Sequence, residues 1–170
     1  MTASAIADLV ERLGRLEDER AILGVLHRFT HCIDYGRERD FVALFTEDGV
    51  FEVRRRTGET ARREGHEELL RFMKSHTRAP GYFHKHLLLS PVITLDGNTA
   101  RAESYWALLD EQSGGPFVKS FGRYRDHLIK DGGEWRIRER KAEVEVRAPD
   151  YAFSGEAVDG DRPGKPGDPS

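Results

Sequence analysis

The stretch YFHKHLLLSPVITLD, residues 82–96, reads as one long extended segment. Successive side chains of a strand point to opposite faces, so this spacing predicts a shared face for His84, His86, Leu88 and Ser90. Two imidazoles then face the same space. A lone histidine on an apolar strand is more often a hydrogen-bonded core residue than a catalyst, so a functional interpretation needs a carboxylate that meets one of these rings.

The second half of the chain consists of extended runs separated by turns that contain glycine. The runs are residues 82–96, 99–111, 117–130 and 134–147. Long runs joined by such turns predict an antiparallel meander of four strands. In the second run, small or apolar residues alternate with larger polar ones from Ala100 to Leu108, which predicts its inner face. Gly122 in the third run indicates a bulge or a place where a ligand comes close.

The first part of the chain predicts helices. Apolar residues recur three or four apart between Ser4 and Tyr35, which is typical of amphipathic helix. Gly14 and the charges after it predict a break near residues 14–17, so we expect a short first helix and a longer second one that ends before Gly36. Asp34 then lies in the last helical turn, where the partial negative charge of the helix end disfavours a carboxylate.

Shorter elements are expected before the meander. They are a helix at 40–45, a strand at 50–53, an edge strand or loop at 62–65 and a helix at 66–76. The last helix places Leu69, Leu70, Phe72 and Met73 on one face. We expect exposed imidazoles at its two ends, from His66 and His76. Helices followed by one curved antiparallel sheet make an α+β fold. A curved sheet with helices on its concave side encloses a cone, and polar groups at the floor of this cone make it a pocket.

Length and composition indicate a single domain. The 170 residues can bury a real core but are too few for two ordinary domains. We expect one domain over residues 1–148 and a flexible or subunit-contacting extension over residues 149–170. The extension is rich in Gly, Pro and Asp and poor in large apolar residues, so it cannot stay folded alone.

Charge and hydropathy exclude several classes of protein. A formal net charge of −3 provides no general attraction to nucleic acid, and no run approaches the roughly 18 apolar residues of a membrane helix. The N-terminus lacks a basic segment followed by a continuous apolar core, so we expect no secretory signal and a cytoplasmic location. The single cysteine, Cys32, excludes an internal disulfide and a cysteine-based zinc site. Phosphate-binding glycine motifs and the GxSxG nucleophile elbow are absent.

Six motifs follow one another in an order that is found in a known family. They are LEDERAI (16–22), IDYG (33–36), FVALFTEDG (41–49), HLLLSPVI (86–93), GRYRD (122–126) and GEWRI (133–137). Over about residues 15 to 147 the chain thereby resembles the SnoaL-like branch of the NTF2-like superfamily. The resemblance implies a cone of N-terminal helices on a curved, mostly antiparallel sheet, and a homo-oligomer, dimer or trimer. The superfamily includes polyketide cyclases, scytalone dehydratase, a dehydrochlorinase and steroid isomerases, and also subunits or carriers without catalysis.

The resemblance also implies a site. Dehydratase and dehydrochlorinase members pair an aspartate at the end of the long helix with a histidine on the first long strand, positions that correspond to Asp34 and His86. Members often carry an asparagine four residues after that histidine, where this chain has Ser90. An arginine on the last strand of dehydrochlorinase-like members corresponds to Arg140. Strict alternation from Trp135, however, places Arg140 on the opposite face of its strand.

A carboxylate bonded to one imidazole nitrogen fixes the tautomer and makes the other nitrogen a better base. Such a pair abstracts a proton from carbon without a cofactor. We expect a nearby group that stabilises the developing negative charge; the candidates are Tyr35, Tyr124, His84 and Arg140. Trp106 is expected either to wall an aromatic substrate or to fill the core, and Phe45 is expected to line the same pocket.

Two classes of function remain open. The first is a cofactor-independent lyase or isomerase, of dehydratase or cyclase type, that acts on a hydrophobic ring-containing small molecule with Asp34 and His86 as its base. The second is a non-catalytic small-molecule-binding protein or the partner subunit of an oxygenase. His27, His31 and Asp34 have the spacing of zinc ligands on a helix, but no HExxH motif accompanies them, so we expect no metal.

Overall fold

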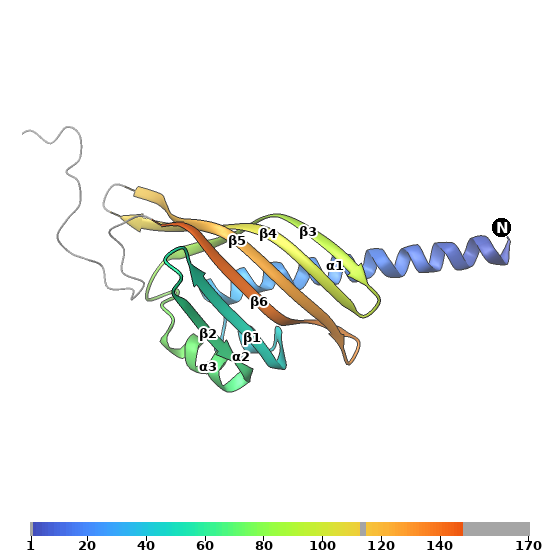
Figure 1. The fold of residues 1–170 in the computed structure, drawn as a ribbon, viewed down its shortest axis with the longest axis horizontal. Coiled ribbons are helices and arrows are strands. Elements are labelled where there is room, and N and C mark those ends of the chain that lie inside the picture. Colours follow the sequence, from blue (N-terminus) through green and yellow to red (C-terminus); the bar gives the residue numbers. More distant parts are fainter. Residues whose placement is uncertain (1, 113–114, 148–170) are drawn as a thin grey trace, which may run out of the picture.

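The computed structural model describes residues 2–112 and 115–147, which form three helices and a six-stranded sheet (Figure 1). The helices are α1 (Ala3–Tyr35), α2 (Glu38–Val42) and α3 (Gly65–Ser75). The strands are β1 (Phe45–Arg55), β2 (Thr60–Glu64), β3 (His84–Asp96), β4 (Thr99–Gln112), β5 (Gly115–Asp131) and β6 (Glu134–Arg147). The expected extension over residues 149–170 lies outside the described residues. Within the described part, no helix is both long enough and apolar enough to cross a membrane.

The sheet has the strand order β2-β1-β6-β5-β4-β3. Strands β3 to β6 form the antiparallel meander that the turns predicted. Strand β1 pairs in parallel with β6, and β2 pairs antiparallel with β1. With the helices packed on one side of this curved sheet, the α+β class and the mostly antiparallel cone are confirmed.

Helix α1 is continuous, so the break predicted near residues 14–17 is wrong. One interior glycine, here Gly14, costs a helix only about 1 kcal/mol relative to alanine. The second half of α1 packs on the sheet through buried apolar side chains that include Ile22, Leu26, Phe29 and Ile33. The first half extends beyond the sheet (Figure 1).

An aromatic cluster fills the space between α1 and the sheet. The rings of Phe29 and Phe41 contact each other and also those of Phe45 and Phe51, with centroid distances of 5.2 to 6.3 Å. All four side chains are buried, and burial of each stabilises the fold by roughly 1.5–3 kcal/mol. The cluster therefore holds the C-terminal half of α1 against the sheet.

Strand β6 contains a bulge that reverses the direction expected for Arg140. The register with β5 shifts between the pairs His127–Glu139 and Leu128–Ile137, so Arg138 is an extra residue. An extra residue interrupts the alternation of side chains. Arg140 therefore points to the inner face and is fully buried.

A second bulge lies in β3. Its register with β4 shifts between Leu89 and Val92, and Ser90 has a φ of 49°. Ser90 is exposed, so the face shared by His84 and His86 does not continue to Ser90 as predicted.

Candidate active site

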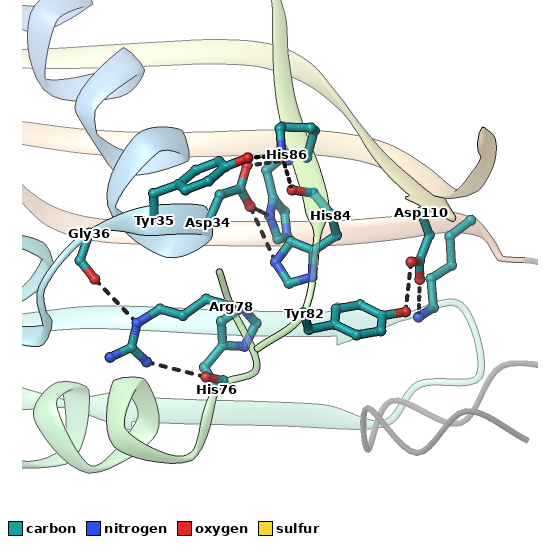
Figure 2. Close-up of polar contacts among 11 residues, drawn as sticks. Asp34, Tyr35, Gly36, His76, Arg78, Tyr82, His84, His86 and Asp110 are labelled. Carbon is teal, nitrogen blue, oxygen red and sulfur yellow. Dashed lines mark hydrogen bonds and ion pairs between the residues drawn. The ribbon is translucent and has the colours of Figure 1, made fainter. Parts of the chain in front are cut away.

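Asp34 lies in the last turn of α1 and points at β3 (Figure 2). Its Oδ1 accepts a hydrogen bond from Nδ1 of His86 at 2.6 Å, and its Oδ2 accepts one from the backbone N–H of His86 at 2.8 Å. The residue is 4% exposed. Because the carboxylate accepts the proton on Nδ1, it leaves the lone pair of the imidazole on Nε2.

The charges of this pair are set by burial and contact. Burial works to raise the pKa of Asp34, but the contacts with His84 and His86 outweigh it and hold that pKa well below its usual range. Burial lowers the pKa of His86, although the bond to Asp34 works in the opposite direction. At neutral pH the pair is therefore a carboxylate and a neutral imidazole, the state in which Nε2 can accept a proton.

His84 lies on the other side of the same carboxylate. Its Nε2 is 3.3 Å from Oδ1 of Asp34, at an angle outside that of a hydrogen bond. Its ring is at 89° to that of His86, with centroids 5.1 Å apart. His84 therefore contacts Asp34 and supports its position.

The loop after α3 compensates for the unfavourable place of Asp34 at a helix end. Arg78 donates hydrogen bonds to the backbone oxygens of Gly36 and His76, both at 3.2 Å. It also pairs with Glu38. A cation at the carbonyl ends of α1 and α3 offsets the negative potential of those ends, which a sequence pattern does not reveal.

A cavity of about 90 Å³ lies beside His86. Its walls come from α1, α3 and the sheet; they include Ile33, Phe51, Val53, Phe72, Trp106, Leu108, Ser120, Tyr124 and Val144. Nε2 of His86 has no hydrogen-bond partner among the described residues, and this ring is the member of the Asp34–His86 pair that lines the cavity. A larger open groove of about 990 Å³ elsewhere contains none of the predicted site residues.

Tyr124 and Trp106, two of the residues expected to bind substrate, both line the cavity. Their rings are stacked with centroids 5.7 Å apart. Burial raises the pKa of Tyr124, so its hydroxyl keeps its proton and can donate. Nε1 of Trp106 is buried without a hydrogen-bond partner in the described part of the chain.

Two predicted site residues lie away from the cavity. Tyr35 is 51% exposed, and its hydroxyl accepts a hydrogen bond from Lys85. One residue step along a helix turns a side chain by about 100°, which directs Tyr35 away from the face that carries Asp34. Phe45 is fully buried in the aromatic cluster.

Arg140 lies behind the cavity wall. Its guanidinium carbon is 4.4 Å from the ring centroid of Tyr124 and 4.0 Å from that of Phe29. It donates two hydrogen bonds to the carboxylate of Asp126, at 2.6 and 2.8 Å. The charge of Arg140 is therefore balanced within the protein.

The sequence interpretation missed His76, and its prediction of an exposed imidazole there is wrong. The ring packs against those of Phe72, His84 and His86 at centroid distances of 5.1, 5.5 and 6.2 Å, and it lines the cavity. Burial, together with His86 and His84, lowers the pKa of His76 to about 3. The signal was available: residue 76 follows Phe72 and Met73 by four and three positions, on the same helical face.

His66, at the other end of α3, is also half-buried rather than exposed. One of its ring nitrogens, Nε2, lies 3.2 Å from the carbonyl oxygen of Phe45. His66 therefore ties the start of α3 to the start of β1.

The donor atoms of Asp34, His84 and His86 lie within 4.8 Å of one another, as in a set of metal ligands. However, the 2.6 Å between Asp34 and His86 fits a hydrogen bond, whereas two ligands about 2.1 Å from one ion at a right angle lie about 3 Å apart. His27 and His31 are exposed, while Asp34 faces β3. His27, His31 and Asp34, whose spacing on the helix resembles that of zinc ligands, therefore do not point to a common site.

Solved structures of other proteins share this fold, among them the following three. An NTF2-like protein with a cystatin-like fold from Novosphingobium aromaticivorans is 23% identical, with 84% of this chain and 92% of that chain covered and a TM-score of 0.71. A protein from the same organism, described as the beta subunit of an aromatic-ring-hydroxylating dioxygenase, is 22% identical, with coverages of 79% and 93% and a TM-score of 0.67. A Catenulispora acidiphila protein in complex with S-DNPA is 23% identical, with coverages of 76% and 94% and a TM-score of 0.63.

Sequence comparison agrees with the fold. No curated protein matches this chain, but the family model of the SnoaL-like domain matches residues 14–141. That match covers the part of α1 from residue 14 onward, which contains Asp34, together with the strand of His86 and most of the meander. The chain belongs to the SnoaL-like domain family.

Proposed function

We propose that the protein is a cytoplasmic, cofactor-independent lyase or isomerase, of dehydratase or cyclase type, that acts on a small hydrophobic ring-containing molecule. One observation carries the proposal: Asp34 holds His86 by a 2.6 Å hydrogen bond, and the same imidazole lines a partly open, largely apolar cavity. A carboxylate–imidazole pair at such a place is the arrangement of a general base.

The reaction begins when Nε2 of His86 takes a proton from a carbon of the substrate. The electron pair of that C–H bond forms a C=C bond if a hydroxyl leaves from the next carbon. The hydroxyl departs with its bonding electrons and, with one proton, becomes water. Without a leaving group, removal of the proton leaves a carbanion. In cyclisation this carbanion attacks a carbonyl carbon of the same substrate, and in isomerisation it takes up a proton at a different carbon.

Tyr124, Trp106 and His76 are among the residues that line the cavity with hydrogen-bonding groups, and such groups can stabilise the oxygen that gains negative charge. The hydroxyl of Tyr124 is protonated, and the indole N–H of Trp106 has no hydrogen-bond partner among the described residues. His76 is neutral above its pKa of about 3, and its buried Nε2 is also unpartnered there. Among the acids expected from the sequence, Tyr124 is the one that the cavity supports.

The size of the cavity limits the substrate. Ligand pockets usually enclose roughly 300–1,000 Å³, and an engineered cavity of about 150 Å³ in another protein accepts benzene. The cavity beside His86 has a volume of about 90 Å³, so its walls have to move apart modestly before it accepts one small ring. A polycyclic substrate requires a larger opening.

The proposal is tested by proton exchange. We expect the protein to exchange the α-hydrogens of small cyclic ketones in heavy water, and to release water from their β-hydroxy derivatives, as followed by NMR. His86→Ala and Asp34→Asn should each lower these rates by roughly 10²–10⁴, the usual contribution of a general base. His31→Ala, which removes an exposed imidazole from the same helix as Asp34, is the matched control.

Circular dichroism should show an unchanged fold in all three variants. Wild-type rates in both His86→Ala and Asp34→Asn, with the fold intact, would contradict the proposal.

A non-catalytic partner subunit is the second candidate. It is favoured by a row of side chains on the outer face of the sheet, formed by Leu87, Ala107, Phe121 and Val146 on four neighbouring strands. Leu87, Phe121 and Val146 are exposed, and a structural neighbour is described as a dioxygenase beta subunit. This candidate predicts no exchange activity in the wild-type protein on any ring ketone tested.

The proposal includes a homo-oligomer. On the overhanging half of α1, Ile6, Leu9, Leu13 and Leu16 are all exposed. Their spacing of three and four residues is the heptad spacing of a helix pair, and Arg12 and Glu17 occupy the flanking positions that meet across a parallel pair. A second copy of the chain therefore suits this surface.

A further inference from the structure

Arg63 lines the same cavity as His86, from the edge strand β2. Its guanidinium carbon lies 4.5 Å from the ring centroid of Phe72, another wall residue. Burial lowers the pKa of Arg63, although nearby Glu68 works in the opposite direction. An arginine remains charged throughout the physiological range, so the cavity carries a fixed positive charge.

Arg63 differs from the other arginines that are buried or half-buried in residues 2–112 and 115–146. Each of those has a carboxylate within 4.0 Å; the pairs are Arg55–Glu59, Arg78–Glu38, Arg123–Glu145, Arg136–Glu134, Arg138–Asp48 and Arg140–Asp126. Arg63 has no carboxylate within 4.0 Å among these residues. Its hydrogen bond to the backbone oxygen of Ala61 is long, at 3.5 Å.

A half-buried charge without a counter-charge in contact is unfavourable. A ligand anion would remove this cost, because the guanidinium fork matches a carboxylate with two parallel hydrogen bonds. Arg55 also lines the cavity, but its guanidinium already forms an ion pair with Glu59. Arg63 is therefore the cation on this wall that is open to a ligand.

We propose that the natural substrate is a small apolar carboxylic acid whose carboxylate pairs with Arg63. Its hydrocarbon part then lies against the apolar walls, and its reactive C–H group faces His86. The position of that C–H group rests on the proposed function, whereas recognition of the carboxylate by Arg63 does not depend on catalysis.

Binding of simple acids and their neutral amides tests the inference. The probes are benzoate with benzamide, and the smaller isobutyrate with isobutyramide, titrated into the wild-type protein by calorimetry. We expect the better-fitting acid to bind about tenfold or more tightly than its amide, since hydrogen bonds to a charged group contribute about that much. Arg63→Gln should abolish the preference by weakening acid binding about tenfold while amide binding stays unchanged.

Arg62→Gln is the matched control, because Arg62 is the neighbour of Arg63 on β2, is exposed and pairs with Glu64. It should leave both affinities within about twofold of the wild type, and Arg63→Lys should keep part of the preference. The inference is wrong if neither acid binds better than its amide to the wild-type protein, a comparison that needs no variant. It is also wrong if the two Gln variants weaken acid binding equally.

The same titration separates this inference from the proposed function. Asp34→Asn should bind the acid with the wild-type preference while it loses proton exchange. An acid preference in a wild-type protein without exchange activity would overturn the proposed function alone. Exchange activity without any acid preference would overturn the role of Arg63 alone.

Discussion

At the scale of single residues, burial decides which histidines carry a proton. His76 lies among Phe72, His84 and His86, and its pKa of about 3 is far below the ordinary value of 6.5. Burial also lowers the pKa of His86. Both rings are therefore neutral at pH 7, so each has one donor nitrogen and one acceptor nitrogen, and Asp34 takes the donor of His86.

This arrangement makes stability depend on pH. Below pH 6.5 the unfolded chain protonates residue 76, whereas the folded chain does so only near pH 3, so the free energy of unfolding falls as the pH drops between these values. From pH 7 to pH 5 the loss due to His76 is about 2 kcal/mol. Asp34 adds its own loss only below about pH 4, since its pKa is held low in the folded state.

Urea unfolding of His76→Gln at pH 7 and pH 5 measures this contribution. The variant should lose about 2 kcal/mol less than the wild type between the two pH values. His31→Gln makes the same change at an exposed position and should follow the wild type. An identical loss in His76→Gln and the wild type would contradict the burial of His76.

The next scale is that of the strands, where bulges in β6 direct side chains to the core. Arg140 reaches the inner face because of the extra residue Arg138. A further register shift lies opposite Gly122, where a Cβ atom would approach the backbone oxygen of Glu143 to 1.9 Å. Of the two roles predicted for Gly122, a bulge does occur at this place, but its extra residue lies in β6 and not in the strand of Gly122, and the close neighbour is the backbone of β6.

Gly122→Ala should therefore lower the free energy of unfolding by at least about 1–3 kcal/mol, because backbone rather than a flexible side chain has to move. Gly24→Ala is the opposite case, since a Cβ atom at Gly24 of α1 meets no atom within 4 Å. It should raise stability by about 0.5–1 kcal/mol. Chemical denaturation measures both, and a Gly122→Ala protein as stable as the wild type would contradict the register described for β5 and β6.

The pair formed by Arg140 and Asp126 joins the same two strands and is fully buried. Asp126→Asn leaves a buried cation without its counter-charge, so it should cost about 3–5 kcal/mol. The double variant Asp126→Leu with Arg140→Met removes both charges and should recover most of this loss. Denaturation curves that show the double variant as the less stable of the two would mean that the pair is favourable in itself.

At the scale of the whole molecule, the proposed homo-oligomer follows from apolar surfaces that are exposed in a single copy of the chain. The overhanging half of α1 carries apolar side chains at heptad spacing outside the core. A helix of this kind gains most of its stability by packing its apolar face against a partner.

Leu9→Glu combined with Leu13→Glu should therefore reduce the molar mass in solution, as measured by light scattering after size-exclusion chromatography. Arg15→Glu changes an exposed side chain of the same helix away from the seam and should leave the mass unchanged. Oligomers that persist in the double variant would place the interface elsewhere, with the outer row of the sheet as the next surface to test.

The sequence by itself determined the order of the elements, the meander with its glycine turns and the inner face of β4. These follow from local patterns, namely side-chain period and turn residues, which do not depend on distant segments. The motif order also pointed to Asp34 and His86 as partners, and the structure brings these two residues together.

Only the tertiary structure decided the rest of the site. The bulge that turns Arg140 inward depends on the strand paired with β6, and the burial of His76 depends on three segments that converge around it. Arg63 lies at the cavity wall because β2 pairs with β1 at the sheet edge. Register, burial and the absence of a counter-charge are properties of contacts between remote parts of the chain, and a pattern within one segment does not contain them.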